Sequence, residues 1–237
     1  MTHLTVAQTE FVESVLDLKP LVAAFDCDGT LWSGDAGEGF FSWELQHGLV
    51  PDEIVRWARA RYAEYRAGKV PEDIMCGEMV TLHCGLREDV VQQACDAYFP
   101  EAIGVNIFPE MRELVRRLRG SGCDVWAVSS SCQWIIRSGM RFFGIPQNRI
   151  LAAEAVVEHG IITDRLVRVP SGPGKVEALR SAIQAPPDCA FGNAIWDREM
   201  LALARHAFAI NANQNLREIA VAKGWTVYQP ETKRTDG

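Results

Sequence analysis

The chain has 237 residues and a formal net charge of −7, with 48% hydrophobic and 23% charged residues. Such a composition supports a sizeable apolar core, and the acidic balance argues against a nucleic-acid partner, which needs a surplus of Lys and Arg. No apolar run approaches the ~20 residues of a membrane span, and the start lacks the pattern of a signal peptide. With seven cysteines and no C-x-x-C spacing, we predict a cytoplasmic protein without a membrane partner.

The first hundred residues predict one strand flanked by helices. Residues 5–19 have helical spacing, and residues 21–25 (LVAAF) form a strand that is apolar on both faces, as in a helix-covered parallel sheet. A glycine-rich loop, residues 33–39, follows. The next stretch carries helix signals only, including two starts in which Pro precedes acidic residues. We therefore predict an all-helical inserted domain over residues 33–104.

Beyond residue 104, apolar strands alternate with helices. The predicted strands and extended segments are 124–128, 149–157, 160–167, 189–191, 206–210 and 225–229. Strands that alternate with helices predict a parallel sheet with right-handed crossovers. The expected fold class is α/β, a Rossmann-like three-layer sandwich with a mostly parallel sheet, whose core comprises residues 1–32 and 105–237.

Polar side chains follow several of these strands or open the helices beyond them. The set comprises Asp26, Asp28, Thr30, Ser129, Lys175, Asn193 and Asp197. In open α/β sheets ligands bind beyond the carboxyl ends of the strands, so these residues should converge. Hard oxygen ligands favour Mg²⁺, a Lys and a Ser hydroxyl suit a phosphoryl group, and a carboxylate can act as a nucleophile.

Each element alone also has a purely structural explanation. An Asp after a strand is often a turn former, and a single Ser or Lys is usually a turn residue or a solvated side chain. The "GPGK" segment invites a P-loop interpretation, but Val176 stands where Ser or Thr is required, so we reject it. The ordered combination favours a phosphoryl-transfer site.

In these motifs the sequence resembles phosphatases of the haloacid dehalogenase superfamily, subfamily I, in the branch similar to phosphoserine phosphatase. The superfamily pattern is D-x-D-x-T, then Ser or Thr after a strand, then Lys, then an acidic G-[DN]-x-x-x-D motif. Asp26 to Thr30, Ser129, Lys175 and Gly192 to Asp197 match it in order. The helical insertion resembles the cap domain of that branch, and the resemblance covers nearly the whole chain.

The resemblance implies hydrolysis of a small phosphorylated metabolite through an aspartyl-phosphate. Asp26 would attack the phosphorus, and Asp28 would protonate the leaving alcohol and then deprotonate water. Ser129 and Lys175 would hold phosphoryl oxygens, and Thr30 would orient Asp28 or the loop.

The resemblance also implies a Mg²⁺ cofactor. Its ligands would be the Asp26 carboxylate, the Asp28 backbone carbonyl, Asn193 and Asp197. Many relatives carry Asp where this chain has Asn193. An amide oxygen coordinates without contributing charge, so direct coordination and an indirect role through Asp197 and water both remain open.

The substrate-binding residues implied in the same way are Thr30, Asp35, Glu38 and Ser130. Asp35 stands where related phosphoserine phosphatases bind the substrate amine, whereas Met79 matches the arginine that binds its carboxylate. No Arg or Lys occurs between Lys69 and Arg87, so we expect phosphoserine to be disfavoured against a small phosphomonoester with a cationic or hydroxylated tail. The aromatic residues of this region are expected in the cap core more than in a pocket: Trp32, Phe40, Trp43, Trp57 and Tyr62.

Three competing functions differ in the motifs that they require. A dehalogenase does not need the second acid, so Asp28 argues against it. A phosphotransferase would keep every motif and stays open. A non-catalytic sensor of a phosphorylated ligand is disfavoured by the intact Asp26, Asp28 and Lys175. The oligomeric state is not predicted.

Overall fold

A computed structural model describes residues 4–231 of the chain. Within this range no helix is both long and apolar enough to cross a bilayer. The helices are α1 (Val6–Leu16), α2 (Ala36–His47), α3 (Asp52–Arg66), α4 (Glu72–Thr81), α5 (Glu88–Ala102), α6 (Pro109–Gly120), α7 (Gln133–Met140), α8 (Pro173–Ala182), α9 (Arg198–Leu203) and α10 (Gln214–Lys223). The strands are β1 (Val22–Phe25), β2 (Asp124–Cys132), β3 (Ile150–Glu158), β4 (Ile161–Arg168), β5 (Cys189–Gly192), β6 (His206–Ile210) and β7 (Thr226–Tyr228). Short 3₁₀ turns include η1 (Gly104–Asn106) and η4 (Ile195–Asp197).

The strands form one sheet in the order β4-β3-β2-β1-β5-β6-β7. Every neighbouring pair is parallel except β3 and β4, which form an antiparallel hairpin at one edge. The central strand β1 is buried on both faces, as its unbroken apolar run predicts. The predicted mostly parallel α/β fold is confirmed.

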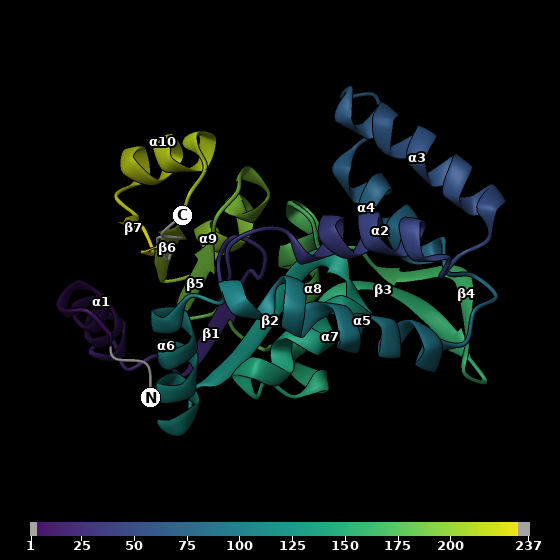
Figure 1. Cartoon of the computed structure of the whole chain (residues 1–237). Coiled ribbons are helices and arrows are strands. Elements are labelled where there is room, and N and C mark those ends of the chain that lie inside the picture. Colours follow the sequence, from purple (N-terminus) through teal and green to yellow (C-terminus); the bar gives the residue numbers. More distant parts are fainter. Residues whose placement is uncertain (1–3, 232–237) are drawn as a thin grey trace, which may run out of the picture.

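Two apolar layers lie on opposite faces of the sheet because successive strand residues point to opposite sides. Ala23 and Phe25 pack into the larger cluster with α1, α6 and α7, whereas Ala24 belongs to a second cluster with α8, α9 and α10. Figure 1 shows helices on both sides of the sheet. The molecule is therefore the three-layer sandwich that the sequence predicts.

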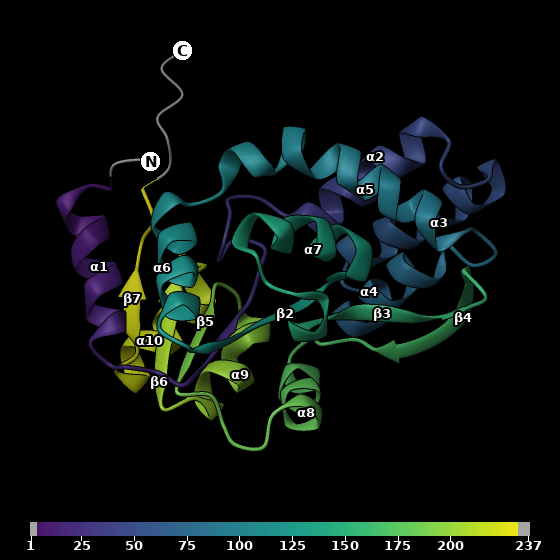
Figure 2. The same ribbon diagram turned by 90° about the horizontal axis from the view of Figure 1, so that it is seen from below.

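The helical insertion gathers at the end of the molecule away from α1 and α10 (Figures 1 and 2). Helices α2 to α4 share their own apolar cluster, which includes Phe41, Ala58 and Met75. Helix α5 differs, because its Val91, Cys95 and Phe99 belong to the main core and it packs on α7. The division into a core and a cap over residues 33–104 stays a prediction. Helix α5 lies in the predicted cap but packs into the main core.

The composition of segment 33–39 predicted a loop, but the structure contradicts this over its second half. Helix α2 begins inside it at Ala36, because the Asp35 carboxylate accepts a hydrogen bond from the Glu38 N–H at 2.8 Å. A carboxylate at this position satisfies an unpaired donor of the first helical turn.

A buried ion pair links α2 to the segment that follows α4. His83 Nε2 lies 2.6 Å from Glu44 Oε2, and both side chains are 1% exposed. His83 Nδ1 lies 3.0 Å from the Val80 carbonyl oxygen. Both ring nitrogens thus face acceptor atoms, which favours the imidazolium form of the ring. Burial lowers the pKa of His83, but Glu44 and the hydrogen bonds outweigh it, so that this pKa is raised.

We predict that His83→Gln lowers the free energy of unfolding by about 3–5 kcal/mol at pH 6, because Glu44 is left buried without its cation. A raised histidine pKa stabilises the fold fully below the unfolded value of about 6.5, and this contribution disappears as the pH rises through the folded pKa. Urea unfolding at several pH values should therefore show the wild-type advantage shrinking on the alkaline side. His47→Gln, at an exposed site of α2, is the control; a difference that stays constant with pH would contradict the imidazolium.

Candidate functional site

The residues singled out at the strand ends converge at one edge of the sheet. Asp26 follows β1, Asn193 follows β5, and Lys175 lies in the first turn of α8. Ser129 lies within β2, which continues to Cys132 instead of ending at Val128 as predicted. The pairing of β2 with β3 shifts register between Val128 and Cys132. Ser129, Ser130 and Ser131 lie within this irregular segment of β2.

Lys175 is the centre of the site. Its ammonium donates to Asp26 Oδ1 at 2.7 Å, to Asp197 Oδ1 at 2.5 Å and to the Val128 carbonyl oxygen at 3.1 Å. The side chain is almost completely buried. Burial disfavours the charged form, but the two carboxylates outweigh it and raise the pKa of Lys175. One permanent ammonium thus holds two carboxylates together.

Asp26 is fixed on both of its oxygens. Oδ1 accepts from Lys175, and Oδ2 accepts from the Thr30 hydroxyl at 2.8 Å. Burial, and then the charge of Asp197, raise the pKa of Asp26 to about 6 against the opposing effects of Lys175 and Thr30. At neutral pH Asp26 is therefore ionised.

Thr30 requires a correction. It was expected to contact the substrate and to orient Asp28 or the loop, but its hydroxyl binds Asp26 and its side chain is fully buried. It is not among the residues that line the cavity described below. Thr30 orients Asp26 instead.

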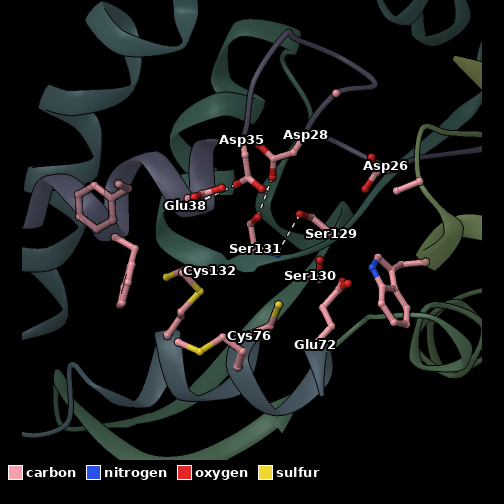
Figure 3. Close-up of a pocket in the computed structure, with 18 of the residues that line it drawn as sticks. Asp26, Asp28, Asp35, Glu38, Glu72, Cys76, Ser129, Ser130, Ser131 and Cys132 are labelled. Atoms are coloured by element: carbon pink, nitrogen blue, oxygen red, sulfur yellow. Dashed lines mark hydrogen bonds between the residues drawn. The ribbon is translucent and has the colours of Figure 1, made fainter. Parts of the chain in front are cut away.

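Asp28 lies in a different environment two residues along the chain. Its Oδ1 accepts from the Trp32 indole N–H at 2.8 Å and from the Ala36 N–H. Its Oδ2 accepts from the Ser131 hydroxyl at 2.7 Å (Figure 3). Removal from water, and then the charge of Asp35, raise the pKa of Asp28 to about 8 despite these donors. At neutral pH Asp28 therefore carries a proton.

Two glycines allow the loops of the site to approach closely. A Cβ on Gly29, whose φ is +73°, would lie 1.8 Å from Asn193 Nδ2. A Cβ on Gly192 would lie 2.5 Å from the Asp197 Cβ. The backbone N–H groups of Asn193 and Ala194 donate to Asp197 Oδ2 at 2.9 and 3.0 Å. The loop after β5 thus presses Asp197 and Asn193 against the loop after β1.

The donor chemistry of this edge fits a magnesium ion. Among residues 4–231 there is no group of three or more His, Cys, Asp or Glu side chains that could hold a metal. The predicted set relies instead on two carboxylates, one amide and one backbone carbonyl, all hard oxygen donors of the kind Mg²⁺ prefers. Asp26 and Asp197 share one ammonium, so the pair retains a negative charge that a cation would balance.

A cavity of about 490 Å³ lies between this edge and the helical insertion. Asp26, Asp28, Ser129 and Lys175 line it, together with Asn193 and Asp197. The expected substrate-binding residues Asp35, Glu38 and Ser130 also line it. Of the five aromatic residues considered above, Phe40 and Tyr62 line the cavity, whereas Trp32 is buried in the main core and Trp57 is 44% exposed.

Several cavity residues were missed at the level of sequence. Arg66 of α3 lines the cavity and was not among the predicted site residues. It lies just outside the span from Lys69 to Arg87 in which a match was sought. Glu72, Ser131 and Trp196 were also missed. Since helical side chains reach the sheet edge through tertiary packing, strand-end spacing carries no signal for Arg66 or Glu72.

Asn211 is a further missed residue of the cavity wall. It has a φ of +47°, and its side-chain amide donates to the Gly29 carbonyl oxygen at 3.1 Å. Asn tolerates the left-handed region better than most residues. Its place directly after β6 is the signal that could have identified it.

We predict that Lys175→Met lowers the free energy of unfolding by about 3–5 kcal/mol, because Asp26 and Asp197 are left buried without their shared cation. Urea unfolding in the presence of EDTA measures the loss. The double variant Asp26→Asn/Lys175→Met should regain part of it, since a single carboxylate then remains. If the double variant is no more stable than Lys175→Met, charge repulsion is not the cause.

Two bacterial proteins are similar to this chain in sequence. A phosphoserine phosphatase of Mycobacterium tuberculosis is 26% identical over 215 residues, which cover 86% of this chain and 69% of that protein. The inhibition of morphological differentiation protein of Streptomyces azureus is 27% identical over 216 residues, or 86% of this chain and 76% of its own length. These identities indicate distant relatives.

Solved structures agree in fold. A Bordetella pertussis protein of unknown function has a TM-score of 0.77 at 19% identity, with 87% of this chain and 97% of that chain covered. A phospho-aspartyl intermediate analogue of phosphoserine phosphatase has a TM-score of 0.58 at 18% identity, with 89% and 93% covered. Residues 23–202, which include both acids of the β1 loop, match the haloacid dehalogenase-like hydrolase family. The chain belongs to that family.

Proposed function

We propose that this hydrolase is a Mg²⁺-dependent phosphatase that cleaves a small phosphomonoester through an aspartyl-phosphate on Asp26. The observation that carries the proposal is the pair of acids after β1, which line one cavity in different environments: Lys175 holds Asp26, whereas neutral donors hold Asp28. These environments give the pKa values of about 6 and about 8. Two carboxyl groups with separated pKa values are the arrangement expected of a nucleophile and a general acid. The relatives named phosphoserine phosphatase support the same chemistry.

Asp26 is suited to attack phosphorus. Its carboxylate is held by Thr30 and Lys175, so its orientation is set before the substrate arrives. A carboxylate that attacks a phosphoester forms an acyl phosphate and expels the alcohol. Its pKa of about 6 keeps it ionised at neutral pH.

Asp28 is suited to move the proton. At neutral pH it carries one, which it gives to the departing alkoxide. The carboxylate that remains accepts a proton from the water that hydrolyses the aspartyl-phosphate. The Trp32, Ala36 and Ser131 donors hold this carboxyl group in place through both steps.

Ser129 and Lys175 would bind the phosphoryl oxygens. The Ser129 hydroxyl oxygen accepts from the Ser131 N–H at 3.1 Å, so its own proton remains to be donated to an oxygen of the substrate. Lys175 supplies the fixed positive charge. Asp26, Asp197, Asn193 and the Asp28 carbonyl would hold Mg²⁺, which when bound neutralises phosphoryl charge as the carboxylate approaches.

The leaving group would occupy the helical side of the cavity. Asp35 and Glu38 provide carboxylates there, and Arg66 provides a cation. The wall therefore offers partners for both charges of a zwitterion such as phosphoserine. A phosphotransferase would use the same machinery with an alcohol in place of water, and new phosphoesters formed with added acceptor alcohols would identify it.

We predict that Asp26→Asn reduces phosphate release at least about 10⁴-fold, because an amide cannot act as the nucleophile. Release of inorganic phosphate from a panel that includes O-phosphoserine and 4-nitrophenyl phosphate measures it, with Mg²⁺ or with EDTA. Asp164→Asn, at an exposed site of β4, should match the wild type. Equal release by wild type and Asp26→Asn would exclude the mechanism, and unchanged release in EDTA would exclude the metal.

We predict that Asp28→Asn lowers turnover about 10²- to 10⁴-fold and leaves a phosphorylated protein behind. With 4-nitrophenyl phosphate the leaving group needs little protonation, so Asp26 still becomes phosphorylated. Hydrolysis of the aspartyl-phosphate lacks its base, and the intermediate accumulates. Intact-protein mass spectrometry after acid quench detects it. Slow turnover without any phosphorylated protein would remove Asp28 from the second step.

A further inference from the structure

Glu72 is a buried carboxyl group that the proposed mechanism does not use. It is the first residue of α4, and its carboxyl group points across the cavity toward Ser130 and Ser129 (Figure 3). The Ser171 hydroxyl, in the core loop before α8, donates to Glu72 Oε1 at 3.0 Å. The residue is 9% exposed and lines the cavity. The helical insertion thus places a carboxyl group beside the proposed phosphoryl site.

The charge of Glu72 is not balanced by the protein. Within residues 4–231 no Lys or Arg forms an ion pair with it, in contrast to Asp26 and Asp197, which share Lys175. The hydrogen bond that Glu72 accepts within the same residues is the one from Ser171 to Oε1. Burial raises the pKa of Glu72 to about 7, so this carboxyl group is partly protonated at neutral pH and a nearby cation would favour its ionised form.

The groups around Glu72 do not supply that cation. Its charge interacts with those of Lys175, Asp197 and Asp26, and Lys175 is already engaged by the two aspartates. Cys76, one turn along α4, is a neutral thiol because burial raises its pKa to about 12. Tyr65 of α3 also lies near enough for Glu72 to raise its pKa. A ligand cation would therefore meet a carboxylate and an aromatic ring.

Most other charged side chains of the helical wall are acidic, like Glu72. Asp35 and Glu38 add two carboxylates, and His83 is neutralised by Glu44. Arg66 is the remaining cation among the described residues of the helical wall, and it is exposed. The buried part of the wall therefore attracts positive charge close to the phosphoryl site.

We propose that Glu72 determines specificity by binding an ammonium group on the leaving alcohol, so that the substrate is the phosphomonoester of an amino alcohol. This inference rests on the proposed phosphatase function. A short alcohol is favoured because Glu72 lines the same cavity as Asp26 and Lys175 and points toward Ser130 and Ser129. The Ser171 hydroxyl holds one carboxyl oxygen of Glu72 in place, and the residue lines the cavity.

The test compares two substrates that differ in one charge. The value of kcat/KM is measured for 2-aminoethyl phosphate and for propyl phosphate, which has nearly the same shape without the charge. Wild type should prefer the amine about 10- to 100-fold, the range of a charge-assisted hydrogen bond. Glu72→Gln should abolish this preference mainly through a higher KM for 2-aminoethyl phosphate, while hydrolysis of 4-nitrophenyl phosphate continues.

Asp73→Asn is the matched control, since it makes the same change at the next, exposed residue of α4. It should keep the preference of the wild type. A wild type without preference for the amine, or a Glu72→Gln variant that retains it, overturns the inference. The comparison of the two substrates with the wild type can overturn the inference even if Glu72→Gln fails to fold. Failure of the proposed function is distinct, because no phosphate would then be released from any monoester, 4-nitrophenyl phosphate included.

Discussion

One buried ammonium organises the catalytic edge of this protein. Lys175 holds Asp26 and Asp197, which come from loops after different strands, and neither carboxylate has another Lys or Arg partner within residues 4–231. Two buried carboxylates without a cation would repel one another and lose their hydration, so the strand ends can meet only around this side chain. Gly29 and Gly192 then become necessary, because larger residues would collide with the loop that presents Asp197.

The chain separates the properties of two acids that are only two residues apart. Asp26 faces Lys175 and Thr30 within the core, whereas Asp28 faces Trp32, Ser131 and the first turn of α2. The positive charge beside Asp26 holds its pKa below that of Asp28, which has neutral donors and the nearby charge of Asp35. The helical insertion therefore affects the environment of Asp28, because the first turn of α2 supplies a hydrogen-bond donor to it.

The sequence predicted what depends on local pattern and chain order. The buried run of β1 and the polar residues that follow the strands identified the sheet edge, since parallel strands end together. The partner of Thr30 and the role of Arg66 and Glu72 could not be predicted, because they depend on how α3, α4 and the core loops pack. Ser131 was missed for a related reason, since β2 continues past the point where its apolar run stops.

Electrostatic balance connects the two proposals. A phosphate monoester brings negative charge into a cavity lined by the acidic residues Asp26, Asp197, Asp35, Glu38 and Glu72. Of the described lysines and arginines, Lys175 and Arg66 line the same cavity, and Lys175 is already paired with Asp26 and Asp197. Such a cavity would repel its own substrate unless further positive charge enters with it. At the sheet edge the proposed divalent cation would supply that charge next to Asp26 and Asp197. On the helical wall the leaving group itself would supply it, and an ammonium beside Glu72 would make binding of the anion favourable while excluding phosphate esters that lack the cation.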